Sequence, residues 1–117
     1  MLHYHVWFNL KAHVEEASGL DTVSGFIAEV CRAGDATGFQ LLKNTGAPPR
    51  SKLPLYHALI EFADGDALGT AMKRQAQRGI HTGSHGRMLE VVCDFQIEVF
   101  TTLTRPETVE ALQACEI

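Results

Sequence analysis

Two histidines near the N-terminus are spaced so that both could act on one ligand. His3 and His5 lie in a segment, residues 2–10, in which apolar and polar side chains alternate. Alternate side chains of a β-strand project from the same face, so both imidazole rings should share one face with Trp7 and Asn9. Histidine transfers protons near neutral pH and also binds metal ions. The spacing therefore indicates either acid–base chemistry or metal binding on one face of a strand.

A second alternating segment, residues 55–62, carries groups that could complete an acid–base site. His57 and Glu61 fall on the same face of this predicted strand. A histidine beside a carboxylate in an apolar-walled pocket can serve as a general base. We therefore predict that His5, His57 and Glu61 are the catalytic acid–base groups.

Substrate-binding residues are expected around the same site. His85 lies in a glycine-rich segment, residues 80–86, which we interpret as a loop near one rim of the sheet. Arg50 lies in a proline-containing segment, residues 45–54, which should form an ordered flap. Its positive charge could meet an anionic substrate at the mouth of the cavity. The predicted substrate-binding residues are His3, Trp7, His85 and Arg50.

The same polar residues have two other interpretations. They could be hydrogen-bonded side chains within a subunit interface, without a catalytic role. They could also bind a metal through His3 and His5, because imidazole suits zinc, iron, copper and nickel. Further ligands would then be His57 or the pair His81 and His85. Glycines next to that pair argue against the helix that would bring its rings together, so neither a metal nor a cofactor is predicted.

The composition limits the partners that the protein is expected to have. Ten Lys and Arg against 14 Asp and Glu give a net charge of −4 (10 − 14), and such a chain lacks the electrostatic footprint of a nucleic-acid-binding protein. No apolar run approaches the roughly 20 residues of a membrane-spanning helix, and the N-terminus lacks a signal-peptide pattern. The three cysteines form no CxxC motif, which favours a reducing cytoplasm. We therefore expect a cytoplasmic protein without nucleic-acid or membrane partners.

The elements that must position these residues follow from hydrophobic periodicity. Period-two alternation predicts strands, and apolar residues at helical spacing predict the helices between them. The first helix should begin at a cap supplied by Ser18 or Asp21 and end at Gly34. The second should run from Asp64 to Gly79. The strands are predicted over residues 2–10, 37–44, 55–62 and 89–100, with a short C-terminal helix over about residues 105–114.

This order of elements, β-α-β-β-α-β, is that of the ferredoxin-like α+β fold. The fold implies an antiparallel sheet of strand order 4-1-3-2 with both long helices on one face. We expect a single domain over residues 1–117, with its core over 2–103 and a C-terminal helical tail over 104–117. On the fourth strand, the helix-covered face should carry Val91, Cys93, Phe95, Ile97 and Val99.

The face of the sheet away from the helices is too apolar to remain exposed. It should carry large hydrophobic side chains among polar ones, including Trp7, Leu42, Leu59 and Phe100. Large exposed apolar patches generally mark interfaces, and a two-fold dimer is the commonest symmetric assembly. We therefore predict a homodimer through the sheet face, which encloses a partly polar chamber where a small-molecule ligand could bind.

The element order over residues 2–103 resembles that of the dimeric α+β-barrel superfamily, which includes antibiotic-biosynthesis monooxygenases, muconolactone isomerases and stress-responsive barrel proteins. Within it, the stretch from Pro48 to Phe62 (PPRSKLPLYHALIEF) looks like that of a bacterial family of unknown function. The resemblance implies a small cofactor-independent enzyme, monooxygenase-like or isomerase-like, acting on a cyclic or aromatic molecule in the barrel cavity. Trp7 and Asn9 match residue types that such oxygenases have near the cavity. The resemblance thus implies that Trp7 shapes the pocket and that Asn9 is a catalytic residue that orients a carbonyl or hydroxyl group of the substrate. The alternatives are a non-catalytic small-molecule-binding or stress-responsive module and a histidine-ligated metal protein.

Overall fold

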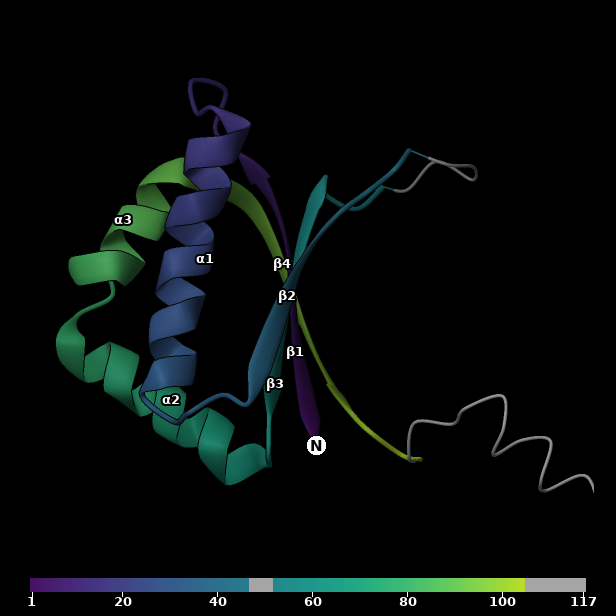
Figure 1. Ribbon diagram of the computed structural model, residues 1–117, viewed down its shortest axis with the longest axis vertical. Helices are drawn as coiled ribbons and strands as arrows, with labels where there is room; N and C mark the ends of the chain where they lie inside the picture. Colours follow the sequence, from purple (N-terminus) through teal and green to yellow (C-terminus); the bar gives the residue numbers. More distant parts are fainter. Residues whose placement is uncertain (47–51, 105–117) are drawn as a thin grey trace, which may run out of the picture.

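Residues 1–46 and 52–104, which the computed structural model describes, form a four-stranded sheet with three helices on one of its faces (Figure 1). The elements in chain order are β1 (Leu2–Leu10), α1 (Glu16–Arg32), β2 (Gly38–Lys43), β3 (Tyr56–Phe62), α2 (Gly65–Arg78), α3 (Gly83–Val91) and β4 (Val92–Thr101). No helix of the described residues covers the other face of the sheet. The two faces therefore have different surroundings.

Strand β1 lies inside the sheet and sets the register of its neighbours. The strand order is β2-β3-β1-β4, and each neighbouring pair is antiparallel. Tyr4 of β1 lies opposite Ile60 of β3 and Val99 of β4, and Trp7 lies opposite His57. This is the predicted order 4-1-3-2 counted from the other edge, so the ferredoxin-like α+β fold is confirmed.

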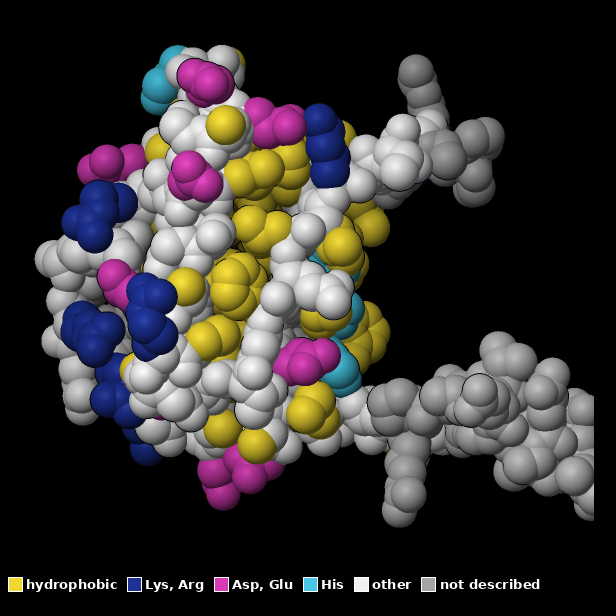
Figure 2. All heavy atoms as spheres, in the orientation of Figure 1, with side chains coloured by type: hydrophobic (Ala, Val, Ile, Leu, Met, Phe, Trp, Pro, Cys, Tyr) yellow, Lys and Arg dark blue, Asp and Glu magenta, His cyan; other side chains and the backbone are white. Residues whose placement is uncertain are grey.

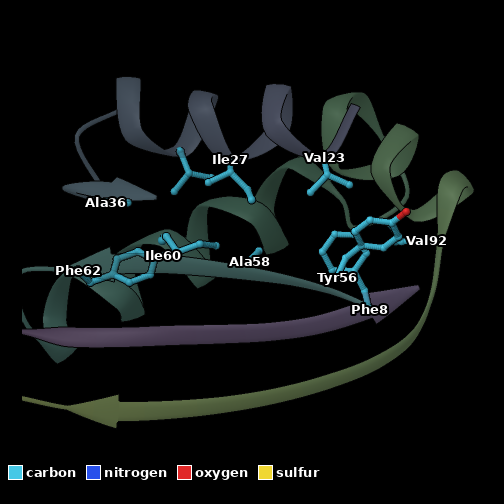
Figure 3. Packing of buried hydrophobic residues seen from close by; sticks show 11 residues of the cluster. Phe8, Val23, Ile27, Ala36, Tyr56, Ala58, Ile60, Phe62 and Val92 are labelled. Carbon is cyan, nitrogen blue, oxygen red and sulfur yellow. The ribbon is translucent and has the colours of Figure 1, made fainter. Parts of the chain in front are cut away.

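The hydrophobic core lies between the sheet and the helices (Figure 3). Val23 and Ile27 of α1 belong to it, together with alternate residues of β3, which are Tyr56, Ala58, Ile60 and Phe62. Burying a large aliphatic or aromatic side chain contributes about 1.5–3 kcal/mol. The buried residues fix which face of β3 meets the helices. As the alternation predicts, His57 and Glu61 project from the opposite face.

Helix α2 has the ends that its sequence predicts. The Asp64 carboxylate accepts a hydrogen bond from the Ala67 backbone N–H at 2.8 Å, and Gly79 follows the helix with φ 91°. Gly34 likewise follows α1 with φ 84°. Glycine adopts this left-handed conformation without strain, so these two positions end their helices as expected.

Helix α1 begins earlier than its sequence predicts. Its N-cap residue is Glu15, which makes no side-chain capping hydrogen bond, so the prediction of a cap at Ser18 or Asp21 is wrong. Packing accounts for the earlier start. A Cβ atom placed on Gly19 would lie only 2.7 Å from the Val14 side chain, so the first turn of α1 sits in close contact with the preceding loop. This contact, rather than a capping side chain, positions the beginning of the helix.

Residues 80–86 do not form the loop that their glycines predict. Helix α3 occupies most of this segment and also includes the first residues of the predicted fourth strand, so β4 begins later than expected. A Cβ atom on Gly86 would lie 2.4 Å from the backbone oxygen of His81. The Ser84 hydroxyl donates a hydrogen bond to the carboxylate of Glu29 in α1. Gly86 therefore permits a close backbone approach within a packed helix, and does not act as a flexible turn.

A β-bulge reverses the predicted faces at the start of β4. The pairing of β4 with β1 shifts register between Trp7 and Asn9, and Asp94 within this shift has φ 58°. Before the bulge, Val92 is buried against the helices and Cys93 lies opposite Asn9, which is the reverse of the prediction. One extra residue in a strand moves the side chains on one side of it to the other face. Beyond the bulge, the predicted faces hold.

Some predictions concern residues outside the described part of the chain. These residues include the C-terminal helix predicted over about 105–114 and the segment 47–51 of the flap, which contains Arg50. Within the described ranges, every helix is too short or too polar to cross a membrane.

Replacing Gly86 with alanine should destabilise the fold, because the new Cβ atom would collide with the His81 carbonyl. We expect the free energy of unfolding of Gly86→Ala, measured by urea denaturation, to fall by about 1–3 kcal/mol. The matched control is Gly69→Ala in α2, where a Cβ atom would meet nothing within 4 Å. Because alanine favours helix, this control should keep its stability or gain up to about 1 kcal/mol. Equal losses in both variants would contradict the packing argument.

Candidate active site on the open face of the sheet

The face of the sheet that the helices leave uncovered, which we call the open face, carries most of the predicted site residues. Figure 2 shows histidine and hydrophobic side chains gathered along this side of the sheet. Leu42 and Phe100, both predicted there, are 45% and 50% exposed. An apolar surface of this kind is suited to a partner or a ligand.

His5 of β1 and His57 of β3 form a hydrogen-bonded pair on the open face, which we call the histidine pair. His5 Nδ1 lies 2.8 Å from His57 Nε2. The Trp7 ring stacks on His57, with ring centroids 4.5 Å apart, and on His5 at 5.6 Å. Phe100 of β4 packs edge-on against His5 at 4.7 Å. The strand register explains this geometry. Trp7 lies directly opposite His57, so His5, two residues before Trp7, is the diagonal neighbour of His57 on the same face.

The surroundings favour the neutral form of both rings. Partial burial lowers the pKa of His5, and the neighbouring charge of His3 lowers it further. Partial burial also lowers the pKa of His57, with a contribution from His5. In a neutral pair one ring donates its N–H and the other accepts it with a lone pair. The histidine pair is therefore able to act as a base at neutral pH.

Glu61 lies beside His3 and not beside the histidine pair. Its Oε1 atom is 3.9 Å from His3 Nδ1, and His3 Nε2 is hydrogen-bonded to the Thr102 hydroxyl at 2.6 Å. The predicted acid–base set of His5, His57 and Glu61 is thus divided, because residues four apart on a strand lie about 13 Å apart. Among the described residues, no carboxylate forms a hydrogen bond with either ring of the pair.

Both ends of the Asn9 amide are held by the protein. Its Oδ1 atom accepts the Leu55 backbone N–H at 2.8 Å, and its Nδ2 atom donates to the Asp94 carboxylate at 3.0 Å. Asp94 is the bulge residue of β4, and bulges re-aim side chains in this way. Asn9 therefore connects the start of β3 to β4. The amide has a second N–H and a second lone pair, so the role of Asn9 in orienting a substrate stays a prediction.

A pocket of about 210 Å³ opens beside the histidine pair. It is lined by Trp7, Leu42, Lys43, Asn44, Leu53, Pro54, Leu55 and His57. His57 is thus the member of the pair that lines this pocket. His5 does not line it but is hydrogen-bonded to His57. The lining combines one aromatic ring and several aliphatic side chains with three polar ones, Lys43, Asn44 and His57.

His85 does not belong to the open face. It lies in α3, on the helix side of the sheet, where its ring packs edge-on against Phe26 of α1 at 4.9 Å. The prediction that His85 lies in a loop near one rim of the sheet is therefore wrong, because residues 83–91 form a helix on the covered face. Arg50 lies outside the described residues, so its role in binding stays a prediction.

Two residues around the histidine pair are missing from the predicted site. Phe100 packs on His5, and the alternation of the fourth strand, which places it on the open face, could have identified it. Asp94 holds Asn9, but it reaches that position only through the bulge. The adjacent apolar residues at 91–93 interrupt the alternation, and this interruption is the sequence signal for the bulge.

The described residues give the metal alternative no ligand set. The ring centroids of His3 and His5 are 6.4 Å apart, with their planes tilted by 48°, and His3 is engaged by Thr102. In residues 1–46 and 52–104, no group of three or more His, Cys, Asp or Glu side chains could hold a metal ion.

Comparison with known proteins yields a family and a fold. A family model described as a family of unknown function, DUF6614, matches residues 1–115. No curated protein matches the chain.

Several solved structures share the fold over most of the chain. The crystal structure of an Arabidopsis thaliana protein has a TM-score of 0.68 and 9% identity, covering 92% of this chain and 100% of that one. A variant of SnoaB, a cofactor-independent oxygenase from Streptomyces nogalater, has a TM-score of 0.66 and 18% identity, covering 91% of this chain and 97% of that one. A dimeric ferredoxin-like protein of unknown function from Thermobifida fusca has a TM-score of 0.58 and 9% identity, covering 86% and 90%. At these identities the similarity shows the fold alone.

The histidine pair should make the stability of the protein depend on pH. Folding lowers the pKa of both rings from the ordinary value of 6.5, so the unfolded chain takes up protons first as the pH falls. The stability contributed by the neutral pair is fully present above pH 6.5 and is lost as the pH falls towards the folded-state pKa values. We expect urea denaturation to show a decreasing free energy of unfolding over this range.

The double variant His5→Phe/His57→Phe should lose less stability than the wild type over the same pH range. His13→Ala changes an exposed histidine away from the pair and should retain the wild-type dependence. An unchanged pH dependence in the double variant would contradict the assignment of the effect to this pair.

Proposed function

The chain belongs to a family of unknown function, DUF6614, and from this premise we propose that it is a homodimer that encloses a small cyclic or aromatic molecule between two open faces. We propose further that the histidine pair moves a proton of that molecule, as in a cofactor-independent monooxygenase or an isomerase. The observation that carries the proposal is the 2.8 Å hydrogen bond between His5 and His57, beside a pocket that His57 and Trp7 line.

The dimer is proposed because the open face is too apolar to be left in water. Leu42 and Phe100 are about half exposed there, and Trp7 stacks on both rings of the histidine pair. Covering apolar surface contributes about 25 cal/mol per Å². A second copy, related by a two-fold axis, would cover both open faces at once. The dimeric protein of similar fold from Thermobifida fusca supports this assembly.

Enclosure between two sheets would make the histidine pair an effective base. Burial lowers the pKa of both rings, so at neutral pH they are unprotonated and available as bases. His57, which lines the pocket, would take a proton from an acidic C–H or O–H bond of the substrate. Its hydrogen bond to His5 would stabilise the imidazolium that results. Trp7 would pack against a ring of the substrate.

Two reactions are consistent with proton abstraction at this site. Return of the proton to a different carbon atom would give an isomerase. Reaction of the carbanion with dioxygen, which converts a CH₂ group to a carbonyl and releases water, would give a monooxygenase without a cofactor. SnoaB, which has a similar fold, is a cofactor-independent oxygenase and supports this second reaction on such a scaffold.

A non-catalytic small-molecule-binding module is the second candidate function. One observation favours it: no carboxylate of the described residues orients the histidine pair, and Glu61 lies beside His3 instead. A histidine base is commonly oriented by a carboxylate or a backbone carbonyl. In this alternative the pair would act only as a hydrogen-bonding wall of the pocket.

Light scattering should give twice the monomer mass of 12.9 kDa at micromolar concentration. Phe100→Lys places a charge on the open face and should produce monomers. Val99→Lys is the matched control, because Val99 lies on the opposite face of β4 and is 47% exposed, and this variant should remain dimeric. A monomeric wild type, or identical behaviour of the two variants, would contradict the face-to-face dimer.

Proton abstraction can be measured with 2-tetralone, a bicyclic ketone with an acidic CH₂ group. We expect the protein to accelerate the exchange of this group with D₂O, followed by NMR, and His57→Gln to reduce the acceleration roughly 100-fold. His13→Ala should keep the full rate. Binding of 2-tetralone without exchange would favour the non-catalytic module, and the absence of both binding and exchange would count against an open-face site for cyclic ketones.

A further inference from the structure

A second cavity, of about 290 Å³, lies on the helix side of the sheet, away from the histidine pair. It is enclosed by β1, β3 and β4 below and by α1 and α3 above. Its lining consists of Tyr4, Val6, Phe8, Val23, Phe26, Ile27, Ala58, Ile60, His85, Met88, Leu89, Val92, Phe95 and Ile97. Figure 3 shows several of these residues, with Val23 and Ile27 of α1 above Ala58 and Ile60 of β3.

The lining of this cavity is almost entirely hydrocarbon. Among the described residues that form it, only Tyr4 and His85 carry nitrogen or oxygen in their side chains. Side chains that border an unfilled space lose the dispersion contacts that a packed neighbour would supply. An apolar ligand would restore those contacts, and one polar atom in an apolar wall would fix its orientation.

The geometry of His85 leaves one ring nitrogen for such a ligand. Its Nδ1 atom lies 2.5 Å from the backbone oxygen of Ile80. A carbonyl oxygen only accepts hydrogen bonds, so Nδ1 carries the proton and Nε2 of the neutral ring has a free lone pair. The ring also packs edge-on against Phe26, which limits its rotation. A backbone carbonyl and an aromatic ring thus hold a hydrogen-bond acceptor at the wall of the cavity.

A smaller neighbouring cavity, of about 140 Å³, meets the same wall. Both cavities are bordered by Tyr4, Phe26, Ile60 and His85. His85 therefore lies where a molecule longer than the first cavity could extend into the second. Ligand sites usually have volumes of about 300 Å³ or more. The first cavity is close to that volume and the second extends it, so together they could hold a molecule of one or two rings.

The cavity has an apolar mouth at β4. Phe95 and Ile97 belong to its lining, yet they are 43% and 50% exposed, because the helices do not cover this edge of the sheet. An apolar molecule could enter along these two side chains without passing charged groups.

We propose that this cavity binds a neutral, largely apolar molecule of one or two rings that carries a hydroxyl group, and that the hydroxyl donates a hydrogen bond to His85 Nε2. This site lies on the opposite face of the sheet from His57, so it does not rest on the proposed function of the open face. His85 Nε2 would favour such a ligand over a hydrocarbon of the same size, because a hydrocarbon has no hydroxyl group to donate a hydrogen bond to it.

The probe for this site is 2-naphthol, with 2-methoxynaphthalene as a matched molecule that lacks the donor. Calorimetry on the full chain should show saturable binding of 2-naphthol about tenfold tighter than of 2-methoxynaphthalene, the effect of one hydrogen bond. His85→Leu should abolish this preference while retaining the weaker apolar binding. His13→Ala, at an exposed histidine that lines neither cavity, should leave both affinities unchanged.

Filling the cavity provides an independent test. Ala58 is 2% exposed and lines the cavity, so Ala58→Leu should displace the probe and abolish binding. If this variant does not fold, NMR contacts between 2-naphthol and the methyl groups of Val23, Ile27 and Met88 in the wild type give the location directly. The proposal is overturned if the wild type shows no saturable binding, if His85→Leu keeps the tenfold preference, or if the contacts fall on the open face. Loss of binding in His57→Gln would likewise assign the probe to the open face.

Discussion

Antiparallel pairing of β1 with β3 sets Trp7 opposite His57, and the pleat of the same strand turns Tyr4 and Phe8 towards the helices. A slip of one residue in this pairing would exchange the two faces, placing histidines in the core and aromatic side chains in water. The core therefore fixes the register, and the register in turn makes His5 and His57 neighbours at 2.8 Å. Both proposed sites depend on this single constraint, one on each face of the sheet.

The bulge in β4 is the main irregularity of the sheet, and it lies beside the open-face pocket. By adding one residue opposite the end of β1, it brings Val92 into the core and directs Asp94 towards Asn9. Asn9 in turn holds the backbone of Leu55, which borders the open-face pocket. A local departure from strand geometry thus supports the wall of the proposed active site, as bulges next to functional sites commonly do.

The two faces of the sheet offer different chemistry. On the open face, two histidines share a hydrogen bond beside aromatic side chains, and burial lowers their pKa values, which keeps both rings unprotonated at neutral pH. On the helix side, His85 is surrounded by hydrocarbon, and Ile80 fixes its protonated nitrogen. The first arrangement suits proton transfer within a closed dimer. The second suits recognition of a single hydroxyl group on an apolar molecule within one subunit.

The sequence by itself determined the four strands, the two long helices and the faces of β1 and β3, because alternation and helical spacing are local properties of the chain. The strand order followed from the fold that this order of elements implies. It also placed His3, His5, Trp7 and His57 on one face. Only the tertiary structure decided that Glu61 lies beside His3, that Asn9 bridges Leu55 and Asp94, and that His85 lies on the helix side of the sheet. These outcomes depend on distances between strands, on a bulge and on a glycine packed against a carbonyl. Such contacts join residues far apart in the chain, and the local pattern marks only the bulge, through the interrupted alternation at residues 91–93.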